Sequence, residues 1–202
     1  KHSIEFLDYF EPKVSDYHNI LSENIIFVER TADVGIIPAD VGINLGVSGP
    51  SLRGSGIKFD LRKDEPYSVY DRFDFDIPVG LGLKGSVGDC WDRYWVRMKE
   101  MEESIKILRQ AISQIPKGDV HEVMPKKIRP NIGNVYSRYE SARGDVGFYI
   151  ISDGKNIPVR VKMRSPAFCN LSALSEIAEG WMISDVITIL GSLDIVLGEI
   201  DR

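Results

Sequence analysis

The feature that most constrains this chain is a long apolar stripe between Asp89 and Pro116. Apolar side chains recur there every three or four residues: Trp91, Trp95, Met98, Met101, Ile105, Leu108, Ile112 and Ile115. A spacing that averages about 3.5 residues is typical of the seam along which the helices of a bundle pack. Asp89 is a suitable N-cap residue, and Pro116 stops the pattern. The sequence therefore predicts one long helix whose apolar side must be covered.

A second helix is predicted near the N-terminus, from about Ser3 to Glu23. Its apolar residues share one face: Ile4, Leu7, Phe10, Val14, Tyr17 and Leu21. Pro12 should bend or interrupt this helix, because proline removes a backbone donor. Two helices are only part of a bundle and leave some of the long helix uncovered. We therefore expect the chain on its own to form homo-oligomers.

Between these helices the sequence predicts little regular structure. Residues 25–29 should be extended or a tight continuation of the first helix, and residues 39–45 should form a short helix after Pro38. Gly and Pro punctuate residues 46–88, which predicts a long irregular connection.

The last third of the chain changes to a strand pattern after a polar, basic connector at residues 122–134. Apolar side chains alternate in two runs, formed by Val146, Phe148 and Ile150 and by Val159, Val161 and Met163. Asp153-Gly154 lies between the runs and predicts a hairpin turn. Residues 171–179 and 184–193 are predicted to be two closing helices.

These elements predict an α+β fold that is mainly α, with long helices of an incomplete bundle and a small antiparallel hairpin or sheet. We expect a single domain over residues 1–202. The helical bundle part should occupy residues 1–118, and the hairpin and C-terminal helices residues 119–202.

The composition excludes several classes of protein. The chain has 202 residues and a net charge of −5, so nothing in its overall charge favours nucleic acid. Two cysteines and three histidines are too few and too scattered for a structural zinc or iron–sulfur site. Cys90 and Cys169 could form one disulfide, but two lone cysteines are typical of buried thiols. The most apolar stretch, residues 183–198, is too short and too charged to span a bilayer.

Three local motifs are weak. Residues 80–85 match the pattern G-x-G-x-x-G, but the strand and helix of a dinucleotide site do not flank them, so we predict a flexible glycine loop. Asp71, Asp74 and Asp76 lack the glycine and glutamate offsets of a calcium loop and predict a solvated acidic turn. No Ser or Cys nucleophile is predicted beside a histidine base, so nucleophilic catalysis is not expected.

Two charged segments need an explanation. One is residues 140–145, which places charges at the edge of an apolar hairpin, and the other is the C-terminal run from Gly191 to Arg202. Chain ends are usually polar, whereas this one is apolar with embedded charges, as if it were buried. Buried charges need partners. Arg143 and Arg202 are the candidate partners of three acids: Asp194, Glu199 and Asp201. A purely structural ion network remains the alternative.

Several strings in the sequence resemble one family over nearly the whole chain. They are residues 49–56 (GPSLRGSG), 60–63 (DLRK), 94–98 (YWVRM), 140–145 (ESARGD) and 193–202 (LDIVLGEIDR). They resemble, in the family order, the C-terminal half of the D subunit of respiratory complex I, the NADH:quinone oxidoreductase. We therefore expect the chain to be a fragment of such a polypeptide. It departs from the family pattern in a longer segment 80–88, a shorter segment 117–134 and Ile195 in place of the usual proline.

The resemblance implies a fold like that of the large subunit of nickel–iron hydrogenases. Those enzymes end in a motif with two cysteines that hold the metal. Val196 and Glu199 stand at the corresponding positions here, and valine cannot ligate a metal. We therefore expect this chain to bind no metal.

The resemblance also implies a function in quinone reduction by a proton-translocating enzyme complex. Quinone, as substrate, would bind between this subunit and a small neighbour that carries the terminal iron–sulfur cluster. The implied lining of the quinone cavity and its charged coupling path is Arg143, Asp194, Val196, Glu199, Asp201 and Arg202. NAD and the iron–sulfur clusters would be bound by partner subunits. The complex would place the chain peripherally on the cytoplasmic side of the inner membrane.

A second interpretation is a non-catalytic scaffold. In that case the chain supplies only subunit contacts, in this complex or in a membrane-bound hydrogenase-like complex. The isolated fragment is expected to be inactive under either interpretation.

Overall fold

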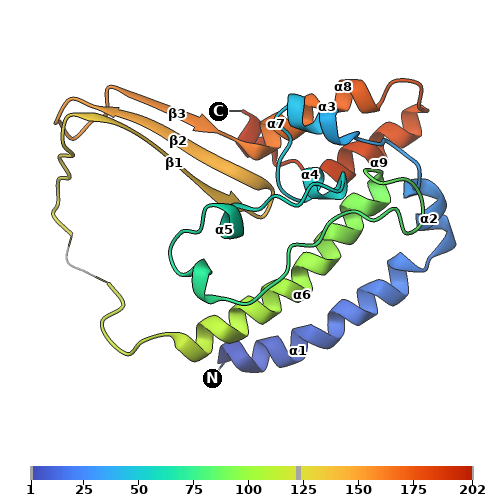
Figure 1. The fold of residues 1–202 in the computed structure, drawn as a ribbon, viewed down its shortest axis with the longest axis horizontal. Coiled ribbons are helices and arrows are strands. Elements are labelled where there is room, and N and C mark those ends of the chain that lie inside the picture. Colours follow the sequence, from blue (N-terminus) through green and yellow to red (C-terminus); the bar gives the residue numbers. More distant parts are fainter. Residues whose placement is uncertain (1, 122–123, 202) are drawn as a thin grey trace.

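Helices and a small sheet follow one another along the chain, as seen in a computed structural model that describes residues 2–121 and 124–201 (Figure 1). The N-terminal part contains α1 (His2–Tyr17), a π-helix (His18–Ser22), α2 (Ile25–Thr31), α3 (Ala39–Asn44), α4 (Pro50–Gly54), α5 (Leu61–Asp64), a 3₁₀ helix (Tyr70–Arg72) and α6 (Cys90–Gln114). The C-terminal part contains β1 (Gly133–Ser141), β2 (Gly144–Ser152), β3 (Arg160–Arg164), α7 (Pro166–Ser172), α8 (Leu174–Ile177), α9 (Ile183–Leu193) and α10 (Leu197–Ile200). The predicted class, α+β and mainly α, is confirmed.

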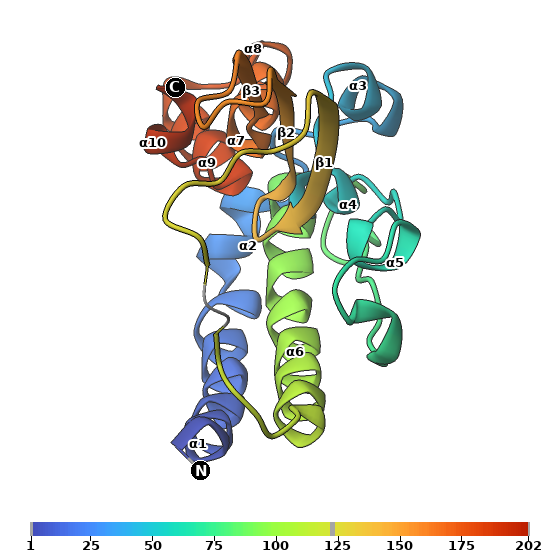
Figure 2. The ribbon, with the colours of Figure 1, turned by 90° about the vertical axis from the view of Figure 1, so that its left-hand side faces the viewer.

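The long helix α6 lies alongside α1 over most of its length (Figure 2). The Asp89 side chain accepts the backbone N–H of Asp92 and caps the first turn, as predicted. Between the two helices lies a buried apolar cluster, formed by Leu7, Val14, Met98 and Ile105. The predicted pairing of two amphipathic helices is therefore confirmed.

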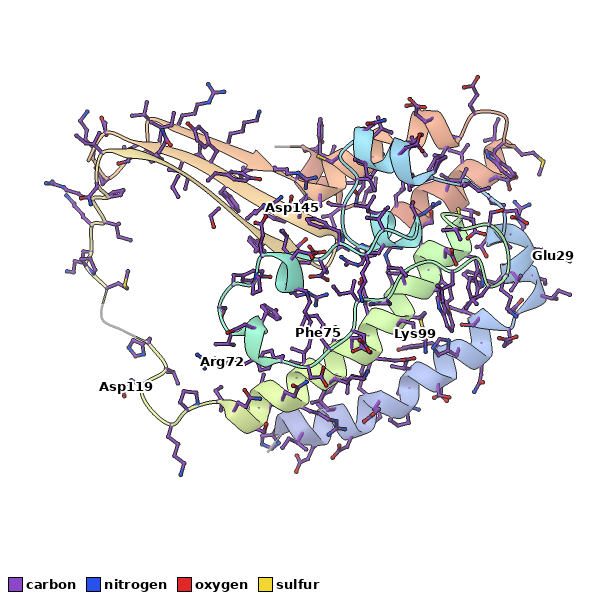
Figure 3. The ribbon with its side chains drawn as sticks, viewed as in Figure 1. Glu29, Arg72, Phe75, Lys99, Asp119 and Asp145 are labelled. Atoms are coloured by element: carbon purple, nitrogen blue, oxygen red, sulfur yellow. The ribbon has the colours of Figure 1, made fainter. Side chains whose placement is uncertain are left out.

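A second cover on α6 comes from the irregular segment that precedes it. Phe73 and Phe75 pack on Ile107, and Phe75 lies against the helix in Figure 3. The sequence had predicted that the first helix would leave part of the long helix uncovered, and this second cover within the chain was not foreseen. Only Leu108 and Ile115 of the predicted stripe remain well exposed, at 47% and 75%.

The N-terminal segment is more helical than predicted. Pro12 lies inside α1 and does not interrupt it, because Leu7 and Val14 on either side are anchored in the core. Residues 25–31 form α2, where an extended segment or tight continuation was expected. The Asn24 side chain accepts the N–H groups of Ile26 and Phe27, and this cap starts a new helix.

The sheet has three antiparallel strands in the order β1-β2-β3. The predicted pairing of β2 with β3 is confirmed, with Phe148 opposite Met163 and Ile150 opposite Val161, although β3 begins after Val159. The hairpin of β1 and β2 was not predicted. β1 carries mostly polar or exposed residues, so apolar alternation is weak in this strand.

The C-terminal helices complete a core with the N-terminal part. Ile37, Leu52, Ile189 and Leu193 are buried together in this cluster. α9 matches the predicted helix 184–193, but the helix expected at 171–179 is split and begins earlier. Ser165 caps α7 and Pro166 occupies its first turn, so the proline that ends the strand also starts the helix.

We predict that Asp89→Ala lowers the free energy of unfolding by about 1–2 kcal/mol, because the cap of the longest helix is lost. Asp89→Asn retains an acceptor oxygen and should lose only a fraction of this. Urea unfolding followed by circular dichroism measures both. Equal losses for the two variants would contradict the prediction and would show that the second carboxylate oxygen, which accepts the N–H of Asp33 at 2.9 Å, matters more than the cap.

Exposed apolar side chains on α1 and on the π-helix predict self-association of the isolated chain. Phe6, Tyr9 and Ile20 are 56%, 64% and 63% exposed there. Each large apolar side chain gains about 1.5–3 kcal/mol on full burial. Size-exclusion chromatography with light scattering should show oligomers that grow with concentration, and the variant Phe6→Ser/Tyr9→Ser should shift toward monomer. A monomer at every concentration contradicts the prediction.

Candidate functional site

A hairpin turn and the end of α9 meet at a charged pair. Arg143 lies in the turn between β1 and β2, and its Nε donates to the backbone oxygen of Asp194 at 2.9 Å. Its Nη2 lies 3.3 Å from Asp194 Oδ1. Asp194 ends α9 in the left-handed conformation, with φ of 53°, which turns its backbone oxygen and side chain away from the helix. The structure thus brings together two of the residues singled out in the sequence.

A second arginine reaches the same carboxylate from α6. Arg97 Nε lies 3.7 Å from Asp194 Oδ2, and its Nη1 donates to the backbone oxygen of Arg93 at 2.8 Å. Burial lowers the pKa of Arg97 to about 10, with the positive charges of Arg93 and Arg143 adding to the effect and Asp194 opposing it. Arg97 therefore stays charged at neutral pH. Two guanidinium groups face one carboxylate, so the site has an excess of positive charge.

The remaining C-terminal residues are placed differently from the expectation. Glu199 has no arginine partner among the described residues; its Oε2 accepts Ser165 Oγ–H at 3.2 Å and Ala167 N–H at 3.1 Å. Val196 is 36% exposed, and Asp201 is exposed. Arg202 lies outside the described residues. The segment is therefore not buried as a whole, because the short helix α10 packs mainly against α7.

A groove lies beside this C-terminal segment. It has a volume of about 760 Å³ and runs between the sheet and the helices α7 and α10. Its wall is mostly apolar and aromatic, and includes Val146, Phe148, Met163, Phe168, Glu199 and Ile200. One end of residues 194–201 therefore touches Arg143, and the other end forms part of the groove.

A buried ionic cluster lies on the other side of the hairpin. Arg53, whose side chain is 1% exposed, contacts Glu100 at 2.7 Å, Glu140 at 2.9 Å and Asp60 at 3.4 Å. Burial acts to raise the pKa of Asp60, but hydrogen bonds from Arg62 and the charge of Arg53 hold it below its usual value. Burial also raises the pKa of Glu140, although the charge of Arg53 opposes this. The sequence had suggested no role for Arg53 or Asp60 beyond their place in matching strings, and none for Glu100.

The glycine motif at residues 80–85 is a packed loop. A Cβ at Gly80 would lie 1.9 Å from the backbone oxygen of Gly54, and the Gly82 N–H donates to the Asp92 carboxylate at 2.9 Å. The glycines therefore allow close packing against α4 and α6, and the expectation of a flexible loop was wrong. In the part of the chain that the structure describes, no group of three or more His, Cys, Asp or Glu could hold a metal ion.

One arrangement of a serine, a histidine and an acid was also not foreseen. His18 Nδ1 lies 2.8 Å from Ser22 Oγ, and its Nε2 lies 3.5 Å from Glu102 Oε1. However, Ser22 is only 2% exposed, and its hydroxyl also contacts Tyr94 OH. No substrate can reach a nucleophile that is buried in this way, so the group joins the π-helix to α6.

Comparison with known proteins identifies the family. The family described as "Respiratory-chain NADH dehydrogenase, 49 Kd subunit" matches residues 1–132 and 121–202. A relative from Chlorobaculum tepidum, named as the D subunit of an NADH-quinone oxidoreductase, is 54% identical over 202 residues, which are 98% of this chain and 50% of the relative. A protein of the same name from Chlorobium luteolum is 52% identical over 202 residues, with 98% and 51% covered. A further relative, from Cytophaga hutchinsonii, is also named as a D subunit of this oxidoreductase and is 47% identical over 206 residues, with 98% and 53% covered.

These matches place the chain among the subunits of respiratory oxidoreductases. More narrowly, it belongs to the family of the 49 kDa subunit of respiratory-chain NADH dehydrogenase. The resemblance that the sequence motifs suggested is confirmed. The chain spans about half the length of the curated relatives it matches. No helix in residues 2–121 or 124–201 is both long and apolar enough to cross a bilayer.

Replacing Asp60 tests the buried ionic cluster. Asp60→Asn should lower the free energy of unfolding at neutral pH by about 3 kcal/mol, because Arg53 and Arg62 lose a buried counter-charge. The pKa of Asp60 is depressed, so its stabilisation is present above the ordinary Asp pKa and is lost as pH falls through the folded-state value. The difference between the two proteins should therefore shrink as pH falls below about 4. Urea unfolding from about pH 7 to about pH 3 measures this, and a difference independent of pH contradicts it.

Proposed function

We propose that the chain forms part of the quinone-reduction-site subunit of a proton-translocating NADH:quinone oxidoreductase. In this proposal it lines the quinone cavity and its charged coupling path. The main support is the group of Arg97, Arg143 and Asp194, which joins α6, the hairpin turn and the C-terminal segment. Membership in the 49 kDa subunit family, whose matched relatives are named as D subunits of NADH-quinone oxidoreductase, supports the same assignment.

The charge of this group suits the reaction. Reduction of a quinone by two electrons places negative charge on its oxygens until protons arrive. Two guanidinium groups opposite one carboxylate stabilise such charge, because cations held in place beside a developing anion lower its energy. Arg143 is the guanidinium group that can move toward the reduced quinone, because its side chain is 32% exposed and contacts Asp194 at the edge of the site. Its partner Asp194 would be released from Arg143 when the anion forms.

The release of Asp194 offers a route from electron transfer to proton movement. A carboxylate that loses one of its cations binds a proton more readily. Arg97 would remain beside Asp194 and limit this change, since Arg97 is held in place by its hydrogen bond to Arg93. In this scheme the chain's own residues hold and move charge, and electrons come from an iron–sulfur cluster on a neighbouring small subunit.

The groove beside α10 supports binding of an apolar ligand against the same C-terminal segment that carries Asp194. Quinones are largely apolar and planar, and binding sites for such molecules are lined by apolar and aromatic side chains with a few polar groups. Phe148, Met163 and Phe168 provide such a wall, and Glu199 provides the carboxylate. Val196, Asp201 and Arg202 are proposed to line the same cavity where it meets the partner subunit.

The proposal also places the chain in an assembly. Other subunits of the complex, above all the small subunit with the terminal iron–sulfur cluster, are the proposed partners. NADH oxidation takes place on a different subunit. The complex would hold the chain at the cytoplasmic side of the inner membrane as a peripheral component.

A non-catalytic scaffold is the second candidate, because the same groove could seat a neighbouring subunit. Photoreactive quinone and labelled inhibitor added to the assembled complex separate the two. Crosslinks to residues 194–201 support the quinone cavity. Crosslinks confined to other subunits support the scaffold.

Arg143→Met in the assembled complex should lower quinone reductase activity by about ten- to a hundredfold, because one cation that stabilises the reduced quinone is removed. Reduction of the iron–sulfur clusters by NADH should persist, since it precedes the quinone step. Lys155→Met, at an exposed position in the turn between β2 and β3, is the matched control and should retain activity. Unchanged turnover in Arg143→Met contradicts the assignment of the site.

A further inference from the structure

We propose that Arg53 and Glu140 form a clamp that positions Arg143 against Asp194. Arg53 is then a positioning residue for the site, although in the described part of the chain it forms no hydrogen bond or ion pair with Arg143 or Asp194. The effect on activity rests on the proposed function of Arg143. The structural part of the proposal rests only on the contacts of the hairpin.

The clamp begins with the burial of Arg53. Its guanidinium donates to Glu100 Oε1 at 2.7 Å, to Glu140 Oε1 at 2.9 Å and to the backbone oxygen of Phe59 at 2.8 Å. A guanidinium has a rigid fork of donors, so these bonds fix the direction of each acceptor. Glu100 is on α6, whereas Glu140 is on the hairpin. Among the contacts of Arg53, the one with Glu140 therefore joins the hairpin to the helical part.

Glu140 is held at three of its oxygens. Besides Arg53, its carboxylate receives the N–H of Leu61 at 3.4 Å, and its backbone oxygen accepts the hydroxyl of Tyr67 at 3.2 Å. Its side chain is 3% exposed. A buried carboxylate with such partners cannot move without leaving charges unpaired, which is costly. The strand is thus fixed three residues before Arg143.

The other side of the turn is fixed to the same short helix. Gly144 follows Arg143 and lies so close to Gly49 that a Cβ on Gly49 would come within 2.5 Å of the Gly144 Cα. Gly49, with φ of 65°, precedes α4, and α4 carries Arg53. Both ends of the turn therefore rest on α4: the strand before it through the Arg53 side chain, and the residue after it through direct backbone contact.

Together with the hydrogen bond that Asn170 donates to the Arg143 backbone oxygen at 3.2 Å, this geometry sets where the Arg143 side chain can reach. Its bonds to Asp194 are 2.9 and 3.3 Å long, and hydrogen bonds weaken steeply with small displacements. A displacement of about 1 Å in a group that acts on a substrate can cost about a hundredfold in rate. Loosening the hairpin at Glu140 should therefore lower activity through Arg143, without any change in residues that face the quinone.

The test is a double-mutant cycle in the assembled complex. Glu140→Gln keeps the size of the side chain and removes its charge, and it should lower quinone reductase activity by about tenfold while NADH still reduces the iron–sulfur clusters. In the Arg143→Met background the same substitution should have no further effect, because the group that it positions is already gone. A general loss of structure would instead multiply the two effects.

Glu65→Gln is the matched control. Glu65 forms an exposed ion pair with Arg138, which joins the same segment before Tyr67 to the same strand β1. Its substitution should leave activity unchanged, because exposed ion pairs contribute little. If Glu140→Gln prevents assembly, Glu140→Asp gives the same test, since aspartate keeps the charge but its shorter side chain does not reach Arg53 as Glu140 does.

The outcomes separate this proposal from the proposed function. An active Arg143→Met complex overturns the site and the clamp together. A weakened Arg143→Met complex with a fully active Glu140→Gln complex overturns the clamp alone. Equal fold losses from Glu140→Gln in both backgrounds also overturn the clamp, because they show that Glu140 acts independently of Arg143. A loss of quinone reductase activity that Glu140→Gln causes in the wild-type background, and not in the Arg143→Met background, supports the clamp.

Discussion

The rest of the structure depends on the burial of α6 on more than one side. Its apolar stripe is covered by α1 and by the aromatic residues Phe73 and Phe75. A different face carries Arg93, Arg97 and Glu100, at spacings of four and three residues that align them along the helix. This face meets α4 and α9. The apolar packing therefore fixes the helix, and the fixed helix presents the charges around which the site is arranged.

Burying these charges does not make the protein more stable than an apolar core would. A buried ion pair loses hydration that its Coulombic attraction only partly returns, whereas removing one partner leaves an uncompensated charge. The main effect of the buried arginines is to hold segments of the chain in fixed positions relative to one another. Arg93 illustrates this: it is fully enclosed and donates to backbone oxygens of Gly35 and Gly88 and to Ser192. Two distant segments, at Gly35 and Ser192, are thereby held against the start of α6, next to Asp194.

Elements with a strong local sequence pattern were predicted correctly, and elements with a weak pattern were missed. The helix 90–114 has a long apolar period, an N-cap and a stop signal, and it formed as expected. β1 has none of these, because the first five of its nine residues are all exposed, and its place depends on the pairing with β2. The helix α2 was missed because a short segment needs only one capping residue, Asn24, to change from extended to helical.

The sequence by itself determined the helical and strand regions with strong periodicity, the absence of paired cysteine motifs and, through its motifs, the family. It also indicated that Arg143 and Asp194 would need partners, because charges in apolar surroundings do. Only the tertiary structure decided that these two residues pair with each other and that Arg97 joins them. It also decided that Arg53 gathers three carboxylates from segments up to 87 residues apart. The charge of a side chain can be read from the sequence. Its partner cannot, because the two residues are brought together by the packing of segments that are far apart in the chain.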